Sequence, residues 1–219
     1  MTEPDAQDHE RPGLSVRRTI TPHGAIVATR MTGDEPLTLG GEHLAGEPVV
    51  DFWRWSMSSL LDNTVRGLFA EYLVARALGV TSTGVRTEWD PVDIVTPEGF
   101  RVEVKSVSFL QSWSQTHAST PKVSIAETLA WDLRTGQYES EARRQADVYV
   151  ICVLDMTDVT ELDPLNLDQW RFLVVPTSIL NNVTARQKSI ALHRLAALPG
   201  VTECGYGTLR DHIDAAGIR

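Results

Sequence analysis

Two apolar runs in the C-terminal half of the chain constrain its fold most. Residues 147–154 read DVYVICVL and residues 170–176 read WRFLVVP. Both are almost continuously apolar and rich in β-branched or aromatic residues, whereas a strand with one wet face alternates apolar and polar residues. We therefore expect two strands, the first of them buried on both faces. Such a strand needs cover on either side, so the class is α/β (α+β), with a central mixed β-sheet flanked by helices.

The rest of the chain supplies the other layers. The clearest helical pattern runs from about Val65 to Leu78, with a capping residue among 62–64 and Gly79 as the terminator. The other expected elements are, in chain order, a helix within 49–63, a strand at 85–90, a hairpin from 92–96 and 100–107, a strand or helix at 122–131, a helix at 138–146, a short helix after Pro176 and a short helix within 191–198.

Residues 1–48 differ in composition from the rest of the chain. They hold five prolines and six glycines, with eight acids against four arginines. We expect an N-terminal arm that is partly disordered, above all in its first dozen residues. Residues 15–20 and 25–30 flank Thr-Pro-His-Gly and predict a hairpin within the arm. A single domain is expected from 49 to 219.

Composition and charge narrow the setting. No apolar run approaches the roughly 20 residues of a membrane span, and the acidic N-terminus is not that of a signal peptide. Two cysteines cannot form a disulfide framework, so a reducing cytoplasm is expected and no membrane partner. The net charge of −9 predicts weak non-specific affinity for nucleic acid. Four of the nine charges belong to the arm (eight acids minus four arginines), so the value does not exclude a phosphate substrate.

The hairpin at 92–107 carries the candidate chemistry. Alternation along FRVEVKSV puts Glu103 and Lys105 on one face, opposite a mostly apolar face. A three-residue loop at 97–99 places Asp93 directly opposite Glu103, with Cβ atoms about 5 Å apart. A two-residue loop would put Asp93 on the face of Val104, which suits a charge less well. Two carboxylates so close repel each other unless a cation lies between them, and Mg²⁺ prefers such oxygen ligands.

A third acid lies on the predicted helix. In GLFAEYLVARAL, Glu71 and Arg76 are the only charges. A carboxylate on such an apolar helix is costly without a partner. Two interpretations stay open: a salt bridge to Arg66, Arg86 or Lys105, or a contact with a metal ion or its water.

These residues resemble the PD-(D/E)xK, restriction-endonuclease-like nuclease superfamily. The likeness covers about residues 51–195 and includes a helix with a Glu, an Asp, nine intervening residues and Glu-x-Lys; Pro91 stands two residues before Asp93. It implies an αβββαβ core and a phosphodiesterase that uses Mg²⁺, with Mn²⁺ as a substitute. Asp93 and Glu103 would bind the metal with the Val104 carbonyl, Glu71 would complete the site, and Lys105 would activate the attacking water.

Several further residues are candidates for substrate contact. Gln111 and Gln115 follow the strand that carries Glu103 and Lys105 and are candidates for the rim of the site. Trp113 is interpreted as a packing anchor. Four cations are candidate nucleic-acid contacts: Arg143, Arg144, Arg186 and Lys188. Solvated helix faces paired with Glu139 and Glu141 explain the first two equally well. Only three lysines occur in the chain, which draws attention to Lys105 in mid-strand.

The sequence therefore predicts a metal-dependent endonuclease acting on nucleic acid, most simply DNA, in a restriction, defence or repair setting as the resemblance implies. Homodimers are common for this fold when both strands are cut. One rival is a catalytically silent protein of the same fold that binds nucleic acid or partner proteins. Another is an unrelated α/β domain in which the same four charged residues form a structural ion-pair network.

Overall fold

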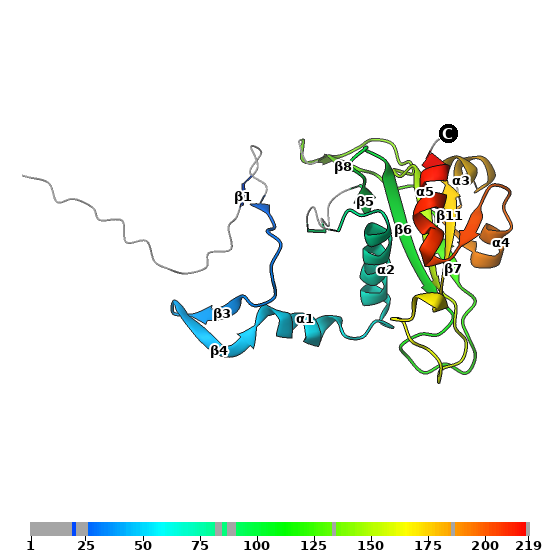
Figure 1. Cartoon of the computed structure of the whole chain (residues 1–219). Coiled ribbons are helices and arrows are strands. Elements are labelled where there is room, and N and C mark those ends of the chain that lie inside the picture. The colour runs from blue at the N-terminus through cyan, green and yellow to red at the C-terminus, as the bar shows by residue number, and fades with distance from the viewer. Residues whose placement is uncertain are drawn as a thin grey trace, which may run out of the picture. The chain divides into compact units, whose positions relative to one another are not determined.

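The computed structural model describes residues 19–20, 26–81, 85–86, 91–132, 135–184 and 187–217 (Figure 1). Contacts within the chain group into two units, Met1–Ser56 and Met57–Arg219. The disorder expected for the first dozen residues falls outside the described residues. No described helix has the length and apolar character that crossing a membrane requires.

The first unit contains two small antiparallel hairpins and a helix. The predicted arm hairpin is confirmed by β1 (Thr19–Ile20) and β2 (Ile26–Val27), which pair through Thr19 with Val27 and Ile20 with Ile26. A second hairpin follows, formed by β3 (Pro36–Leu39) and β4 (Glu42–Pro48). The helix expected within 49–63 is α1 (Val49–Met57).

A five-stranded mixed sheet organises the second unit. Its order is β13-β11-β10-β6-β5, and only β6 and β10 run parallel. Both apolar runs form central or near-central strands, as predicted. The strands are β5 (Ile94–Val95), β6 (Arg101–Ser108), β10 (Val148–Leu154), β11 (Trp170–Pro176) and β13 (Thr202–Cys204). Every residue of β10 is buried, because the sheet is covered on both faces.

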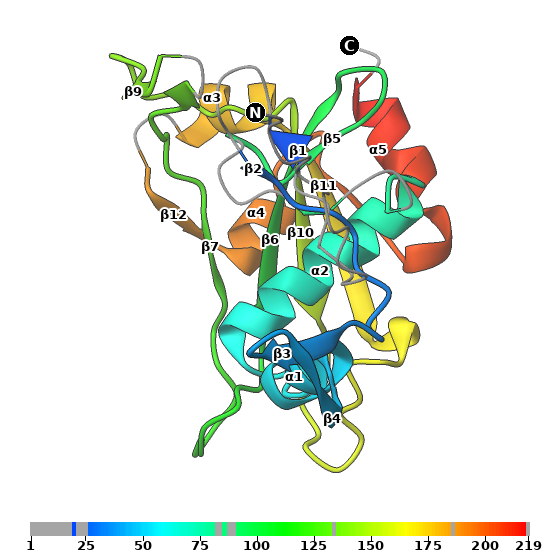
Figure 2. The same cartoon turned by 90° about the vertical axis from the view of Figure 1, so that its left-hand side faces the viewer.

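Two separate cores explain that burial. On one face, α2 (Asn63–Ala77) and α5 (Leu209–Gly217) pack on Val102, Val104 and the even-numbered residues of β10. On the other face, α3 (Thr177–Thr184), α4 (Leu192–Ala196), β7 (Lys122–Ser124) and β12 (Ser189–Ala191) pack on the odd-numbered residues. Figure 2 shows α2 running across the sheet, with α3 and α4 behind it. The central mixed sheet flanked by helices is confirmed.

The helix α2 begins and ends as its sequence dictates. The Asp62 carboxylate accepts from the backbone N–H groups of Thr64 at 2.9 Å and of Val65 at 3.4 Å, which satisfies donors that the helix leaves free. Gly79 ends the helix with a φ of +77°, a conformation that favours glycine. The helix that presents Glu71 is thus fixed at both ends by local chemistry.

The prediction of a helix at 138–146 is wrong. The chain instead forms a hairpin of β8 (Trp131–Asp132) and β9 (Gln137–Tyr138), and Arg143 then pairs with Thr128 in an isolated bridge. The rings of Trp131 and Tyr138 meet edge to face, with centroids 4.9 Å apart. Tertiary pairing therefore overrides the helical pattern. The strand expected at 85–90 falls mostly outside the described residues, and residues 85–86 are not in a strand.

Short 3₁₀ turns complete the second unit, at Leu167–Gln169 and Tyr206–Thr208.

Candidate active site

The hairpin that carries the candidate acids has the predicted register. Ile94 pairs with Val102 and Val95 with Arg101, so paired residue numbers sum to 196 in both cases (94 + 102, 95 + 101). The backbone N–H of Thr96 donates to the Phe100 carbonyl at 2.9 Å and closes a three-residue loop. Continued by one step, this register sets Asp93 opposite Glu103. The two-residue loop is excluded.

Asp93 directly precedes β5 and lies beside the part of β6 that extends beyond the paired residues. Its Oδ2 accepts from the backbone N–H of Val104 at 2.7 Å. The Asp93 side chain thus takes the place of a backbone acceptor on the edge of β6. It is held directly between the residues that precede and follow Val104, which are Glu103 and Lys105.

The surroundings of Asp93 disfavour its charge. Burial, followed by the nearby Glu103 carboxylate, raises the pKa of Asp93 to about 6, and Glu71 adds to the rise. The Val104 N–H and Lys105 act in the opposite direction without cancelling it. Glu103 and Glu71 are therefore both close enough to Asp93 to raise its pKa.

Glu103 and Lys105 form an ion pair on the face of the sheet opposite α2. In the parallel register Glu103 lies beside Tyr149 and Lys105 beside Ile151, both in the core under α3 and α4. The Glu103 side chain is 19% exposed and that of Lys105 is 33% exposed. The pair is partly covered yet still open to a ligand.

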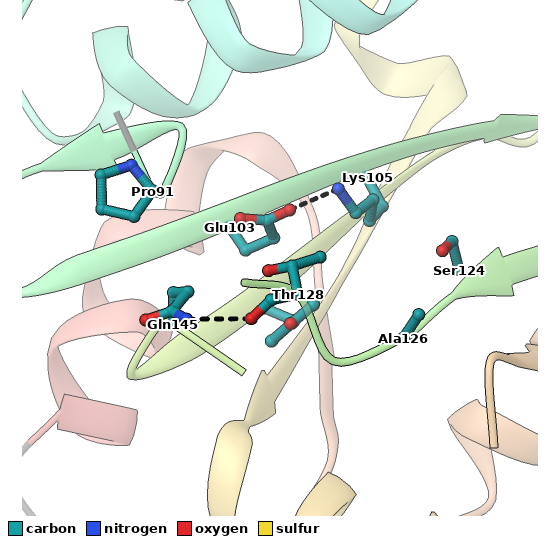
Figure 3. A pocket seen from close by; sticks show the side chains of 8 residues that line it. Pro91, Glu103, Lys105, Ser124, Ala126, Thr128 and Gln145 are labelled. Carbon is teal, nitrogen blue, oxygen red and sulfur yellow. Dashed lines mark hydrogen bonds and ion pairs between the residues drawn. The ribbon is translucent and has the colours of Figure 1, made fainter. Parts of the chain in front are cut away.

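A cavity of about 60 Å³ adjoins this pair (Figure 3). Glu103, Lys105 and Pro91 line it, and all three were noted in the sequence. The rest of its wall consists of residues that the sequence did not single out for the site: Ser124, Ala126, Thr128, Gln145 and Tyr149. Figure 3 shows the Gln145 amide donating to the Thr128 carbonyl, a contact of 3.1 Å. No local pattern marks Ser124, Thr128 or Gln145, because long-range pairing alone brings them beside β6.

Glu71 is held by a cation. Arg86 donates to both carboxylate oxygens of Glu71 through Nε and Nη2, the latter at 3.2 Å. Of the three cations considered from sequence, Arg86 is therefore the partner, and the Glu71 side chain is only 16% exposed. Glu71 nevertheless acts on Asp93 electrostatically. The salt-bridge interpretation describes this arrangement, and a metal contact by Glu71 stays a prediction.

The donor set suits a hard divalent cation in its chemistry. Glu71, Asp93 and Glu103 offer only oxygen ligands, as Mg²⁺ prefers, and the raised pKa of Asp93 shows that more positive charge would be favourable there. In the described part of the chain, no three His, Cys, Asp or Glu side chains are grouped closely enough to hold a metal ion. Glu71 and Glu103 instead point to Arg86 and Lys105.

The two glutamines after β6 have different roles. Gln115 braces its loop: its Oε1 accepts from the backbone N–H of Gln111 at 2.6 Å, and its Nε2 donates to Ser119 Oγ at 2.9 Å. Gln111 donates to the Ser108 carbonyl at 2.9 Å and lines a second cavity. Neither glutamine lines the cavity beside Lys105, and Trp113, interpreted as an anchor, is 57% exposed.

The cations proposed to contact nucleic acid lie in different environments. The Arg144 side chain is fully buried and donates to the Ile125 carbonyl at 2.9 Å and to Asn181 Oδ1 at 2.8 Å. It is therefore a structural residue, which corrects the expected surface role. Arg143 is exposed and paired with Glu139 at 3.2 Å. Lys188 is exposed beside β12, and Arg186 lies outside the described residues.

Comparison with known proteins gives one family. The family model described as "Bacteriophage T4 endonuclease IV" matches residues 54–194, which is 141 of the 219 residues. The match includes the whole hairpin, Glu71 and both cavities. No curated protein matches the chain.

Proposed function

The chain belongs to the bacteriophage T4 endonuclease IV family, and on that premise we propose that it is a divalent-metal-dependent endonuclease of the PD-(D/E)xK type that hydrolyses phosphodiester bonds in DNA. The family match supports nuclease activity. The observation that carries the finer proposal is the β5–β6 hairpin, whose register sets Asp93 opposite Glu103 and whose Glu103 and Lys105 line one cavity.

Asp93 and Glu103 are the residues that would hold the cation, with the Val104 carbonyl and Glu71 as further oxygen donors. Such a cation, when bound, lowers the pKa of a coordinated water and neutralises charge on the phosphate. The raised pKa of Asp93 supports this assignment, since burial first and then two neighbouring acids disfavour its ionisation in the metal-free protein. Mn²⁺ is expected to replace Mg²⁺.

Lys105 is the proposed proton-handling and charge-offsetting group. Its ammonium lies at the cavity wall, one third exposed, and Glu103 holds it there. A donor in that position can orient the attacking water and stabilise the negative charge that develops on the phosphate. Thr128 and Gln145 line the same cavity and give the phosphate group a polar wall.

The decisive experiment compares two cation deletions in the purified full chain. Lys105→Ala should abolish Mg²⁺-dependent cleavage of DNA and leave the circular dichroism spectrum unchanged. Arg210→Ala is the matched control, because it also removes an ion-paired cation, 3.3 Å from Asp214, and it should cut as the wild type does. Plasmid, linear duplex, single-stranded DNA and RNA are all assayed, with Mg²⁺ and with Mn²⁺.

Two outcomes would remove the proposal. If the wild type cuts none of the substrates with either metal, the metal-dependent endonuclease is refuted. DNA binding without cleavage would then favour a silent nuclease-fold protein. If Lys105→Ala cuts as fast as Arg210→Ala, the assigned site is wrong even though the chain is a nuclease. Oligomeric state is read from the same preparations by light scattering, and a homodimer is expected if both strands are cut.

A further inference from the structure

A second and larger cavity, of about 380 Å³, adjoins the C-terminal half of β6. It lies between the start of α2, residues 106–108 of β6 and the loop that follows this strand. Its volume falls within the range of small-molecule sites in proteins. The same strand that carries Glu103 and Lys105 thus continues into a separate polar cavity.

A buried cation forms part of its wall. Arg66 is 4% exposed, and its guanidinium donates to Ser106 Oγ at 3.3 Å, to the Leu61 carbonyl at 3.0 Å and to Asn63 Oδ1 at 2.6 Å. These bonds use three of its five N–H groups. Among the described residues no carboxylate forms an ion pair with Arg66, and burial lowers its pKa more than the nearby Asp62 raises it. A buried charge of this kind attracts an anion.

Two buried oxygen atoms in the wall lack hydrogen-bond partners among the described residues: Ser108 Oγ and Gln111 Oε1. Ser108 is 2% exposed, and burying a polar atom without a partner is costly. The loop bonds made by Gln115 hold Gln111 in place. Both residues line the cavity, so a ligand whose hydrogen-bond donors reached these buried oxygens would satisfy them.

The open side of the cavity combines an aromatic ring with a second cation. Trp113 is 57% exposed and Lys122 is exposed on β7, and both line the cavity. An exposed tryptophan offers a face on which a base stacks, as in single-stranded nucleic-acid complexes. Lysine is a common phosphate ligand. The wall therefore offers contacts for an anion, for a planar ring and for polar groups on that ring.

We propose that this cavity is a nucleotide subsite, in which Arg66 and Lys122 hold a phosphate, Trp113 stacks on the base, and Ser108 and Gln111 hydrogen-bond to the base. Its role as a substrate subsite rests on the proposed nuclease function. Ser108 follows Lys105 by three residues, or about 10 Å of strand, so its side chain lies on the α2 face of β6 and that of Lys105 on the opposite face. A substrate that reaches both sites must pass around β6, so the subsite holds a nucleotide away from the scissile bond.

The test measures binding in the full chain without any need for cleavage. Calorimetric titration uses deoxynucleoside 5′-monophosphates and, separately, inorganic phosphate. A mononucleotide should bind more tightly than phosphate, and Trp113→Ala should weaken the mononucleotide about tenfold while leaving phosphate unaffected. Lys122→Ala should weaken both ligands. Trp55→Ala is the control, since Trp55 is an exposed tryptophan outside this wall.

Ser108→Ala separates binding from folding. Removal of an unpartnered buried hydroxyl should leave the free protein as stable as the wild type or more stable, and it should weaken the mononucleotide. On an oligonucleotide, Trp113→Ala should raise KM with kcat within about twofold, as expected for a residue that binds substrate and transition state alike.

The assignment is overturned if no mononucleotide binds, or if Trp113→Ala and Lys122→Ala both leave its affinity unchanged. Its failure is distinguishable from that of the proposed function. Cleavage by the wild type without mononucleotide binding removes the subsite alone. If the wild type cuts nothing but binds a mononucleotide, and the Trp113→Ala and Lys122→Ala variants bind it more weakly, the nucleotide site is supported and the proposed nuclease function is refuted. Lys105→Ala should bind the mononucleotide as the wild type does.

Discussion

Replacing Asp93 by asparagine should stabilise the metal-free protein at pH 8. The folded protein raises the pKa of this carboxyl from 3.8 to about 6, a difference of about 2 units, or roughly 3 kcal/mol of free energy that opposes folding once the group is ionised. The amide oxygen of asparagine can still accept from the Val104 N–H, and the loss of charge assistance in this bond is already contained in the net pKa rise. The expected gain in unfolding free energy is therefore up to about 3 kcal/mol.

The pH dependence has a definite sign. Between pH 3.8 and about 6 the folded protein binds more protons at Asp93 than the unfolded chain does. The contribution of Asp93 to stability therefore falls as the pH rises through this window and stays low above it. The gain from Asp93→Asn should be full at pH 8 and should vanish at pH values below 3.8, where the carboxyl is neutral in both states.

Asp147, which directly precedes the neighbouring strand β10, is the matched control. Burial alone would raise its pKa, but the Arg101 side chain and backbone N–H, at 3.1 and 2.9 Å, hold the pKa of Asp147 below its ordinary value. Asp147→Asn should therefore destabilise the protein at pH 8. Urea unfolding, followed by circular dichroism in the presence of a chelator, measures both variants.

The reasoning is refuted if Asp93→Asn lowers the unfolding free energy at pH 8 as Asp147→Asn does. A second measurement separates repulsion from metal binding. Saturating Mg²⁺ should raise the melting temperature of the wild type, because a ligand that binds only the folded state stabilises it. It should not raise that of Asp93→Asn. An equal rise in both proteins would exclude Asp93 as a metal ligand.

Three further predictions concern the fold and are measured by urea unfolding. Arg144→Ala should cost about 3 kcal/mol, because it removes a fully buried side chain with bonds to two elements, whereas the exposed Arg143→Ala should stay within about 0.5 kcal/mol; similar losses would contradict the structural role of Arg144. Asp62→Ala should cost about 1 kcal/mol through loss of the α2 cap, and an unchanged midpoint would argue against the cap. Gly200→Ala should cost more than about 1 kcal/mol, since φ is +89° and the new Cβ would lie 2.8 Å from Ile179 Cδ1; a variant as stable as the wild type would refute this conformation.

The sequence predicted the site hairpin well because its evidence is local. Alternation along β6 assigned Glu103 and Lys105 to one face, and the length of the 97–99 loop fixed the register. The same holds for the two buried strands and for α2, where a continuous apolar run and a cap residue act within a few positions of each other. Element type follows directly where one periodicity dominates a segment.

The sequence could not predict contacts that depend on distant segments. The 138–146 segment has a helical pattern, yet Arg143 pairs with Thr128 across the fold, and Gln145 lines the cavity beside Glu103. Arginine is usually a surface residue, but the fold buries the Arg144 side chain and supplies the Ile125 carbonyl and Asn181 Oδ1 as acceptors. Among three cations open to Glu71, only the folded chain distinguishes Arg86.

Under the proposed function, Arg86 and Lys105 also matter to the protein before it binds a metal ion. When ionised, the three candidate acids Glu71, Asp93 and Glu103 carry three negative charges. Arg86 and Lys105 neutralise two of these charges through their ion pairs. The site therefore holds one net negative charge, and none when Asp93 is protonated. A newly made chain can complete its fold with internal counter-ions, and the protein can be stored without metal in a state that is stable and, under the proposed function, harmless to DNA.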